Sequence, residues 1–320
     1  LGLVGSEMCI RDRYLNIPQK EVHPGQLVTV CIKAVNRHVI FLGKQQFQIG
    51  VAYLNTPGNE KEMLQCDGVT EKVQQTMAEF SPKHCGIAQI DIEKVFLQDY
   101  LGLIGTQKNF RGSCQLAVLP EPVLSTRVRT GMEKQQEYRY SAVADDDSDI
   151  LDLRAFRPGD NLNHIHWNLS LRTDDLIVRQ YGEQIDVKKV ILVDLSILNT
   201  AQYRSRMDAV YTAVASIANL YVENEVNTLI LAWNGQKQSA EYLEVHDRTE
   251  LNRAMIRLMQ IPCSSRAGEH AAAVYLKDIE AQGQQALFVT AGSYENNKVR
   301  IVNVEKIQLQ ELIDELWEKI

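Results

Sequence analysis

The sequence predicts an all-β, sandwich-like domain followed by an α/β domain with a mostly parallel, helix-covered sheet. In the first part, short runs alternate polar and apolar residues and are separated by turn residues, as in half-buried strands. In the later part, apolar strand-like runs alternate with segments whose apolar residues recur at helical spacing. The chain has 320 residues, enough for two domains. We predict the β domain over residues 14–122, a linker over 123–151, and the α/β domain over 152–320.

The β domain is predicted from about six short strands joined by turns. Gln46–Leu54 alternates in the pattern of a half-buried strand, and Thr56–Asn59 has the composition of a turn. Further extended runs cover residues 27–32, 70–80, 86–97 and 113–119. His84 and Cys85 invite a metal or thiol-catalysis interpretation. Neighbouring side chains on a strand point to opposite faces, so we favour a structural role for this pair.

The α/β domain is predicted element by element. Val190–Val193 is a continuous apolar run ending at Asp194, as in a central parallel strand. Asn234-Gly235 is a hairpin signal between two strand-like runs. Asp247 is a helix cap with Glu250 at the capping-box position. The remaining expected elements are a helix with apolar residues from Met207 to Tyr221, a helix over 268–281, strands over 286–290 and 299–304, and a final helix over 309–317.

Composition and charge exclude some classes. The net charge of −7 and pI near 5.6 argue against a general binder of nucleic acid or anionic membranes. The six cysteines form no Cys-x-x-Cys pair, which favours free thiols in a reducing compartment. We find no membrane-spanning apolar run and no signal peptide. Residues 1–13 look like translated sequencing-adapter read, and we leave them out of the fold prediction.

The linker contains an acidic run, Asp145-Asp146-Asp147-Ser148-Asp149. A calcium loop would need a glycine and a distal glutamate that this run lacks. We therefore expect a solvated linker, with partner binding as the alternative.

The block from Asp152 to Gln180 mixes opposite charges around one tryptophan. Its arginines are Arg154, Arg157, Arg172 and Arg179, its aspartates include Asp160, and Trp167 is its large apolar residue. Two interpretations are equally favoured: an ion-pair network that clamps the segment, or an exposed Arg/Trp patch that docks a protein. His164 and His166 suggest a metal site on a strand, but no further ligand is evident, so we favour a structural role.

This block resembles the signature of the domain-of-unknown-function family 58. The residues that carry the resemblance are Arg154-x-Phe156-Arg157-Pro158-Gly159-Asp160, Ile165-His166-Trp167-Asn168-Leu169-Ser170, Arg172-Thr173 and Val178-Arg179. The resemblance implies a bacterial protein with a von Willebrand factor A-like, Rossmann-like domain. It also implies gene neighbours encoding MoxR-type AAA+ ATPases, and two membrane helices that would precede this chain and hold it at the inner, cytoplasmic face of the membrane.

The same resemblance implies a place for a metal site. The pattern Asp-x-Ser-x-Ser becomes Asp194-Leu195-Ser196-Ile197-Leu198, so its last hydroxyl is lost. Ser264 or Ser265 stands in for an expected threonine, and Ala291 takes the place of an expected aspartate. Mg²⁺ needs about six oxygen ligands. We therefore expect Asp194 and Ser196 to form a degenerate site with weak or no Mg²⁺ binding, and no other cofactor.

These observations predict a non-enzymatic protein-interaction module, with a MoxR-type AAA+ ATPase as the partner implied by the resemblance. No Walker A loop, nucleophile elbow, dinucleotide-binding motif or zinc-protease motif appears. The alternatives are a metal-dependent enzyme using Asp194 and Ser196, or a structural component of the cell envelope.

Overall fold

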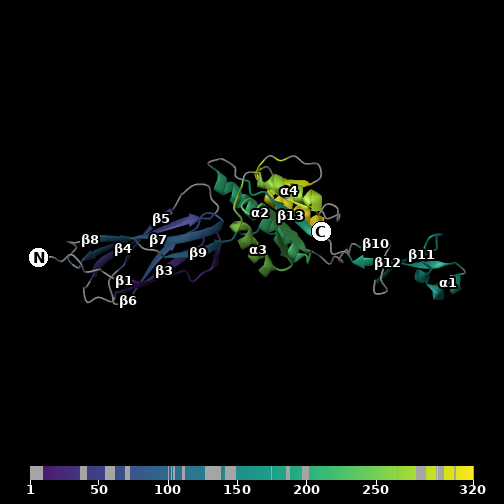
Figure 1. Ribbon diagram of the computed structural model, residues 1–320, viewed down its shortest axis with the longest axis horizontal. Coiled ribbons are helices and arrows are strands. Elements are labelled where there is room, and N and C mark those ends of the chain that lie inside the picture. The colour runs from purple at the N-terminus through teal and green to yellow at the C-terminus, as the bar shows by residue number, and fades with distance from the viewer. Residues whose placement is uncertain are drawn as a thin grey trace. The chain divides into compact units, whose positions relative to one another are not determined.

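The computed structural model describes residues 10–36, 42–54, 62–68, 73–99, 101, 103, 105–109, 112–126, 138–140, 149–173, 175–184, 188–196, 202–264, 266–278, 286–292, 294, 299–305 and 308–319. Its contacts divide the chain into two compact units. Unit 1 comprises Leu1–Arg127 and Lys189–Ile320, and unit 2 comprises Val128–Lys188. Figure 1 shows both units and labels many of their elements.

Unit 1 begins with a β-rich region built of two sheets. The smaller sheet is antiparallel and has the order β1 (Ile10–Asn16), β3 (Val28–Asn36), β6 (Val73–Phe80). The larger has the order β2 (Glu21–Val22), β9 (Ser113–Val118), β7 (Gly86–Asp99), β4 (Leu42–Tyr53), β5 (Glu62–Gly68), with β8 (Gly105–Asn109) also paired to β7. All its pairs are antiparallel except β2 with β9.

The two sheets share one hydrophobic core. Alternate residues of β3 and β4, including Val30, Ile32, Phe47 and Ile49, are fully buried within it. The period-two pattern of the sequence therefore has its physical cause here, because every second side chain of a strand points into the core. The prediction of a β-rich, sandwich-like first region is confirmed.

The rest of unit 1 is an α/β layer structure around a five-stranded sheet. The strand order is β15 (Ser239–Val245), β14 (Thr228–Asn234), β13 (Lys189–Val193), β16 (Ala286–Thr290), β17 (Arg300–Asn303). Only β15 runs antiparallel to its neighbour. Val190–Val193 is fully buried because both faces of β13 are covered, which explains its unbroken apolar run.

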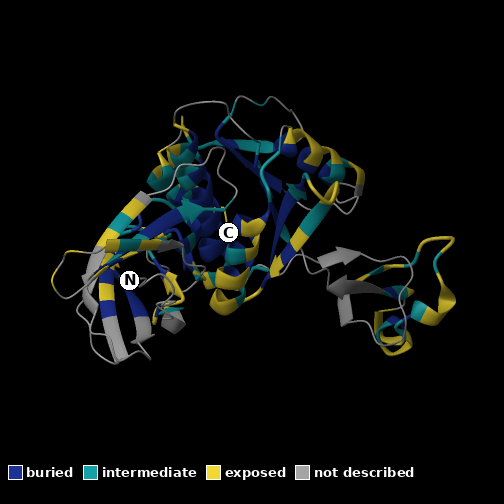
Figure 2. Cartoon of the chain, turned by 60° about the vertical axis from the view of Figure 1, so that its left-hand side comes forward, coloured by how far each residue is buried: buried dark blue, intermediate teal, exposed yellow. Residues whose placement is uncertain are grey.

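Helices cover both faces of this sheet. On one face, α2 (Tyr203–Glu223), α3 (Arg248–Gln260) and α5 (Leu309–Glu318) share a core with Ile191 and Val193. On the other face, α4 (Ala267–Asp278) packs through Ala271 and Tyr275 against Val190 and Leu192. Figure 2 shows this buried centre. The first core also includes Ile87, Ala117 and Leu119, so the β-rich region and the α/β layers pack together.

Local signals in the α/β part are confirmed. The predicted hairpin joins β14 to β15. Asp247 Oδ1 accepts a hydrogen bond from the backbone N–H of Glu250 at 2.7 Å and caps α3. The Glu250 carboxylate reaches one residue further back than a capping box requires, and accepts from the N–H of His246 at 3.0 Å.

Unit 2 is small, and few of its described side chains are buried. Its three-stranded antiparallel sheet has the order β10 (Tyr138–Tyr140), β12 (Ile177–Gln184), β11 (Asp149–Ala155). A 3₁₀ turn, η1 (Leu162–His164), and a short helix, α1 (Trp167–Thr173), connect β11 to β12. Among its described side chains, the buried hydrophobic ones are Ile165 and Val178.

The compact units differ from the predicted domain boundaries. We predicted that the Arg/Trp block and the α/β sheet form one domain. In the structure the block belongs to unit 2, where β11 pairs with β12. Asp145–Asp147 lie outside the described residues. Ile10–Arg13, which we excluded, form the first part of β1, a pairing that does not test where those residues come from. None of the described helices is long and apolar enough to cross a membrane.

Candidate functional site

Asp194 lies at the carboxyl edge of the parallel sheet, immediately after β13. In open α/β sheets this edge, at the point where the strand order reverses, is where ligands bind. The strand order reverses at β13, which lies between β14 and β16. Ser196 follows and forms an isolated bridge with Ser264. The structure therefore brings together Asp194, Ser196 and Ser264.

Hydrogen bonds engage both oxygens of the Asp194 carboxylate. Oδ1 accepts from the backbone N–H of Ser196 at 3.0 Å, and Oδ2 accepts from the Thr290 hydroxyl at 2.6 Å. Thr290 is completely buried at the end of β16, and its hydroxyl also accepts from the N–H of Gly292 at 2.9 Å. Asp194 thus joins the ends of two neighbouring strands.

The first turn of α4 closes over this carboxylate. The N–H of Gly268 donates to Ser196 Oγ at 3.1 Å. A Cβ atom on Gly268 would lie 2.4 Å from Asp194 Oδ1, so a larger residue there would require the carboxylate or the helix to shift. The positive end of the helix dipole therefore faces a negative charge supplied by the protein itself.

The oxygen donors at this edge come from Asp194, Ser196 and Thr290. Among the described residues no group of three or more His, Cys, Asp or Glu side chains gathers to hold a metal ion. The carboxylate has Thr290 as its partner, and the next residue, Ala291, which stands where an aspartate was expected, is buried. Leu198 and Ser265 lie outside the described residues. Mg²⁺ is usually held by one or two carboxylates together with further oxygens in near-octahedral geometry, and here each oxygen of the Asp194 carboxylate accepts one hydrogen bond.

The Arg/Trp block of unit 2 contains one strong ion pair. Arg154 and Asp160 form a bidentate pair, with N···O distances of 2.7 and 2.6 Å. Asp160 also accepts from the backbone N–H of Arg157 at 2.7 Å. The hydrogen bond from Arg154, and then that from Arg157, lower the pKa of Asp160 to about 2. These contacts fix the Pro158-Gly159 turn, in which Gly159 has a φ of +108° that suits glycine.

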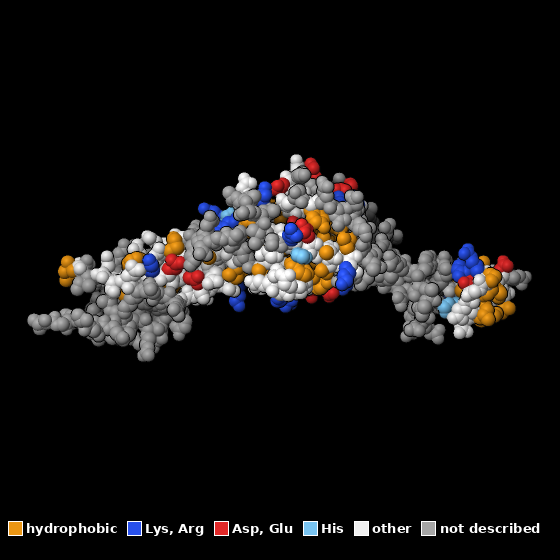
Figure 3. Space-filling view, turned by 45° about the horizontal axis from the view of Figure 1, so that its top comes forward, with side chains coloured by type: hydrophobic (Ala, Val, Ile, Leu, Met, Phe, Trp, Pro, Cys, Tyr) orange, Lys and Arg blue, Asp and Glu red, His pale blue; other side chains and the backbone are white. Residues whose placement is uncertain are grey.

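Other residues of the block are turned to solvent. Trp167 is 58% exposed and Leu171, four positions later on α1, is 79% exposed. Residues at this spacing are neighbours on a helix surface. Arg157 and Arg172 are also exposed, whereas Arg179 on β12 is half-buried. On unit 2, Figure 3 shows hydrophobic side chains gathered next to Lys and Arg side chains.

The two histidines of the block do not lie on a strand. His164 ends η1 and His166 precedes α1. His166 Nδ1 accepts from the N–H of Leu169 at 3.2 Å and so caps the helix. Ser170 Oγ accepts from the N–H of Ile177 at 2.9 Å, which ties α1 to β12. Both contacts support a structural role for this part of the block.

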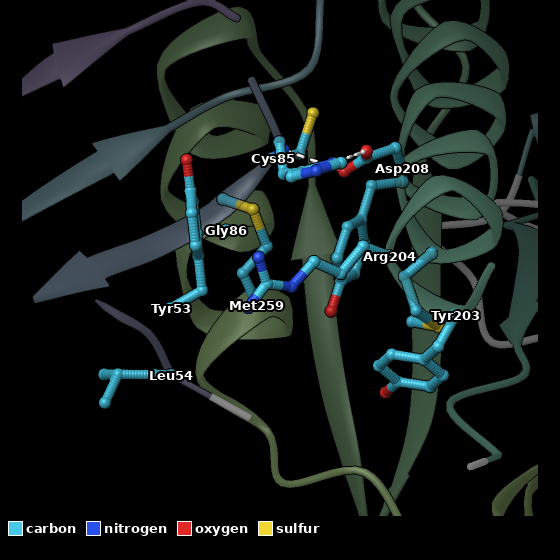
Figure 4. A pocket seen from close by; sticks show the side chains of 11 residues that line it. Tyr53, Leu54, Cys85, Gly86, Tyr203, Arg204, Asp208 and Met259 are labelled. Atoms are coloured by element: carbon cyan, nitrogen blue, oxygen red, sulfur yellow. Dashed lines mark hydrogen bonds and ion pairs between the residues drawn. The ribbon is translucent and has the colours of Figure 1, made fainter. Parts of the chain in front are cut away.

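A pocket within unit 1 lies where the β-rich region meets α2 (Figure 4). Asp208 of α2 contacts His84 Nδ1 at 2.7 Å and accepts from the N–H of Cys85 at 2.8 Å. Arg204 lies over the ring of Tyr53, 5.7 Å from its centroid. The cavity measures about 30 Å³, room for one water molecule.

The chemistry of this pocket supports a structural role for His84 and Cys85. Burial, with the negative charge of Asp208, raises the pKa of the Cys85 thiol to about 12. A thiol with such a pKa is not a nucleophile at neutral pH. Burial also raises the pKa of Asp208, which the hydrogen bond from His84 opposes.

Several residues at these sites were not predicted from the sequence. Thr290, Gly268 and Asp208 form their contacts with residues distant in the chain, and no local motif marks them. The only available signal for Thr290 was its position at the end of a buried apolar run, beside Ala291.

Comparisons with solved structures match about a third of the chain each. A cohesin module from Clostridium perfringens is 8% identical, with 33% of this chain and 95% of that chain covered and a TM-score of 0.25. A CARDB domain from Pyrococcus furiosus is 11% identical, with 34% and 88% covered and a TM-score of 0.21. The alkylpurine DNA glycosylase AlkC of Pseudomonas fluorescens is 10% identical, with 33% of this chain and only 29% of that chain covered and a TM-score of 0.25. Likeness at this level carries no conclusion about function.

No match was found among curated proteins. Residues 152–298 match the family model described as "Protein of unknown function DUF58". The resemblance predicted from the Arg/Trp block is therefore confirmed over this segment.

Proposed function

We propose that the protein is a non-enzymatic interaction module in which unit 2 docks a protein partner. The observation that carries the proposal is the exposure of Trp167 and Leu171 side by side on α1. Tryptophan is among the residues most enriched in interface hot spots, and most of the surface of both side chains is exposed to solvent. We call Trp167 and Leu171 the docking pair.

The Arg/Trp block contains two kinds of charged residue, those that hold its fold and those that face solvent, and this division supports the assignment. Arg154 and Asp160 neutralise each other and hold the turn before η1. Arg157 and Arg172 remain exposed in the same unit. One part of the block is therefore a clamp, and the other part is available to a partner.

Charge indicates what kind of partner fits. The chain as a whole carries a net charge of −7, and unit 2 has eight Lys and Arg residues against twelve Asp and Glu, so its exposed Arg157 and Arg172 are individual cationic groups in an acidic unit. The complementary surface is an apolar pocket for the docking pair, rimmed by carboxylates that pair with arginine. The family resemblance makes a MoxR-type AAA+ ATPase at the cytoplasmic face of the membrane the first candidate.

The α/β layers supply the frame for this module. The strand order, with one antiparallel edge strand and helices on both faces, supports the von Willebrand factor A-like plan. We infer that Asp194 and Ser196 make up a degenerate metal site, because Leu198 and Ala291 stand where the metal-binding pattern has a hydroxyl and a carboxylate. These replacements favour a binding role over the alternative of a metal-dependent enzyme. The alternative of a structural component of the cell envelope is tested by reading the full gene for membrane helices.

The test measures binding to a purified MoxR-type ATPase encoded beside this gene, with and without ATP. We expect Trp167→Ala and Leu171→Ala each to weaken binding about tenfold or more, since hot-spot truncations cost more than about 1.4 kcal/mol. The matched controls are Leu27→Ala and Leu103→Ala in unit 1, whose side chains are 59% and 79% exposed.

The result must also separate binding from folding. Thermal unfolding and circular dichroism of all four variants should match the wild type, because none of the side chains is buried. The proposal fails if the wild-type chain does not bind the ATPase in either nucleotide state, or if the control variants weaken binding as much as the docking-pair variants.

A further inference from the structure

Residues 123–126, which follow the β-rich region in the chain and precede unit 2, are held against helix α5 by the carboxylate of Asp314. Asp314 accepts hydrogen bonds from Ser125 Oγ at 2.8 Å, from the backbone N–H of Thr126 at 3.0 Å and from Thr126 Oγ1 at 2.9 Å. Gln310, one turn earlier on α5, donates its side-chain amide to the carbonyl of Leu124 at 3.0 Å. Three consecutive residues of the segment are thus bonded to one helix face.

A further bond ties the same segment to α2. The N–H of Val123 donates to Ser216 Oγ at 2.9 Å, and that hydroxyl donates onward to the carbonyl of Thr212 within the helix. The segment has neither helix nor strand geometry of its own. Its backbone therefore depends on these side chains in place of a regular hydrogen-bond ladder.

We infer that Val123–Thr126 is a latch, closed by Asp314, that fixes where the chain leaves unit 1 before it enters unit 2. Unit 1 ends its first segment at Arg127, directly after the latch. When the latch opens, Ser125 and Thr126 lose their hydrogen bonds to Asp314, and their polar groups bond to water instead.

The latch is built to open without unfolding the core. Thr126 is exposed and Ser125 is only half-buried, so water can replace their bonds to Asp314. Opening such a segment is a local event with a small free energy compared with global unfolding. The inference stands independently of any partner, because it concerns hydrogen bonds within unit 1.

Negative charge at Thr126 is expected to open the latch. A second carboxylate placed there would face Asp314 at close range, and like charges repel. The hydrogen bonds from Ser125 and Thr126 keep the pKa of Asp314 below its ordinary value, so this group stays ionised at neutral pH. The latch is therefore sensitive to charge, and Thr126 is the position through which an acidic modification would act.

Amide hydrogen exchange on the full chain tests the inference. We expect Asp314→Ala to speed exchange at the Thr126 amide about tenfold or more. The matched control is Glu311→Ala, which removes an exposed carboxylate from the same helix. Amides in the middle of α2 should exchange alike in all variants, which shows that the core is intact.

A second pair of variants separates charge from size. Thr126→Glu should open the latch further than Thr126→Gln, and raised salt should reduce the difference by screening. The inference is overturned if Thr126 exchanges at the wild-type rate in Asp314→Ala. It is also overturned if Thr126→Glu and Thr126→Gln exchange equally. Failure of the ATPase-binding experiment would leave both readouts unchanged.

Discussion

Replacing Thr290 by valine tests whether Asp194 is a structural anchor. Valine keeps the shape of threonine and removes its hydroxyl, so both bonds of that hydroxyl are lost: the one donated to Asp194 Oδ2 and the one accepted from Gly292. The position is completely buried, so water cannot replace the hydroxyl there. Leaving a buried partner unsatisfied costs about 1–3 kcal/mol, and bonds to charged groups lie at the upper end. Asp194 itself is half-buried, which reduces the loss, and we expect about 2 kcal/mol.

The assay is urea unfolding followed by tryptophan fluorescence, with Thr290→Ser as the matched control. Serine keeps the hydroxyl and loses one buried methyl group, which costs about 1 kcal/mol. We expect the valine variant to be the less stable of the two. In an Asp194→Ala background the valine substitution should cost less, because its main partner is already gone, and the difference measures the coupling.

Two results would refute this reasoning. One is a valine variant at least as stable as the serine variant, which would show that the hydroxyl bond adds nothing. The other is a wild-type chain that Mg²⁺ stabilises strongly, since ligand binding raises apparent stability by mass action. That second result would mean that the Asp194 carboxylate exchanges its internal partners for a metal ion.

Three further predictions concern single groups. Calorimetry should show no micromolar Mg²⁺ binding by the wild-type chain, and micromolar binding abolished by Asp194→Ala would contradict the degenerate site. Gly268→Ala should destabilise unit 1 by about 1–3 kcal/mol, because its Cβ would overlap the Asp194 carboxylate; unchanged stability would show that the helix shifts freely. The ion pair of Asp160 with Arg154 should stabilise unit 2 above about pH 4. This stabilisation should be lost as the pH falls toward about 2, since the pKa of Asp160 in the folded state lies near 2. An NMR titration in which the Asp160 carboxyl has an ordinary midpoint would contradict this.

The features that the sequence predicted are those set by neighbours in the chain. The apolar run before Asp194 identified a doubly covered strand, since burial on both faces removes the alternation of strand residues. The Asn234-Gly235 turn and the Asp247 cap involve residues a few positions apart. Each of these signals is local, and the structure confirms each.

The contacts that were missed join residues far apart in the chain. Thr290 reaches Asp194 across 96 positions, His84 reaches Asp208 across 124, and Ser125 reaches Asp314 across 189. A threonine or an aspartate has no local pattern that names such a partner. Only the order of strands in the sheet and the packing of α2 and α5 bring these pairs together, and neither is encoded near the residues concerned.

The Arg/Trp block shows how one motif can serve two purposes. From the sequence, an ion-pair clamp and a docking patch were equally favoured, because arginine suits both. In the structure Arg154 is engaged by Asp160, while Trp167 faces solvent on a helix whose N-terminus His166 caps. The clamp stiffens the turn and the cap stiffens the helix, so the exposed tryptophan is presented on an ordered support. Pre-organisation lowers the entropy lost on binding, which is why the same segment would need both its charges and its tryptophan.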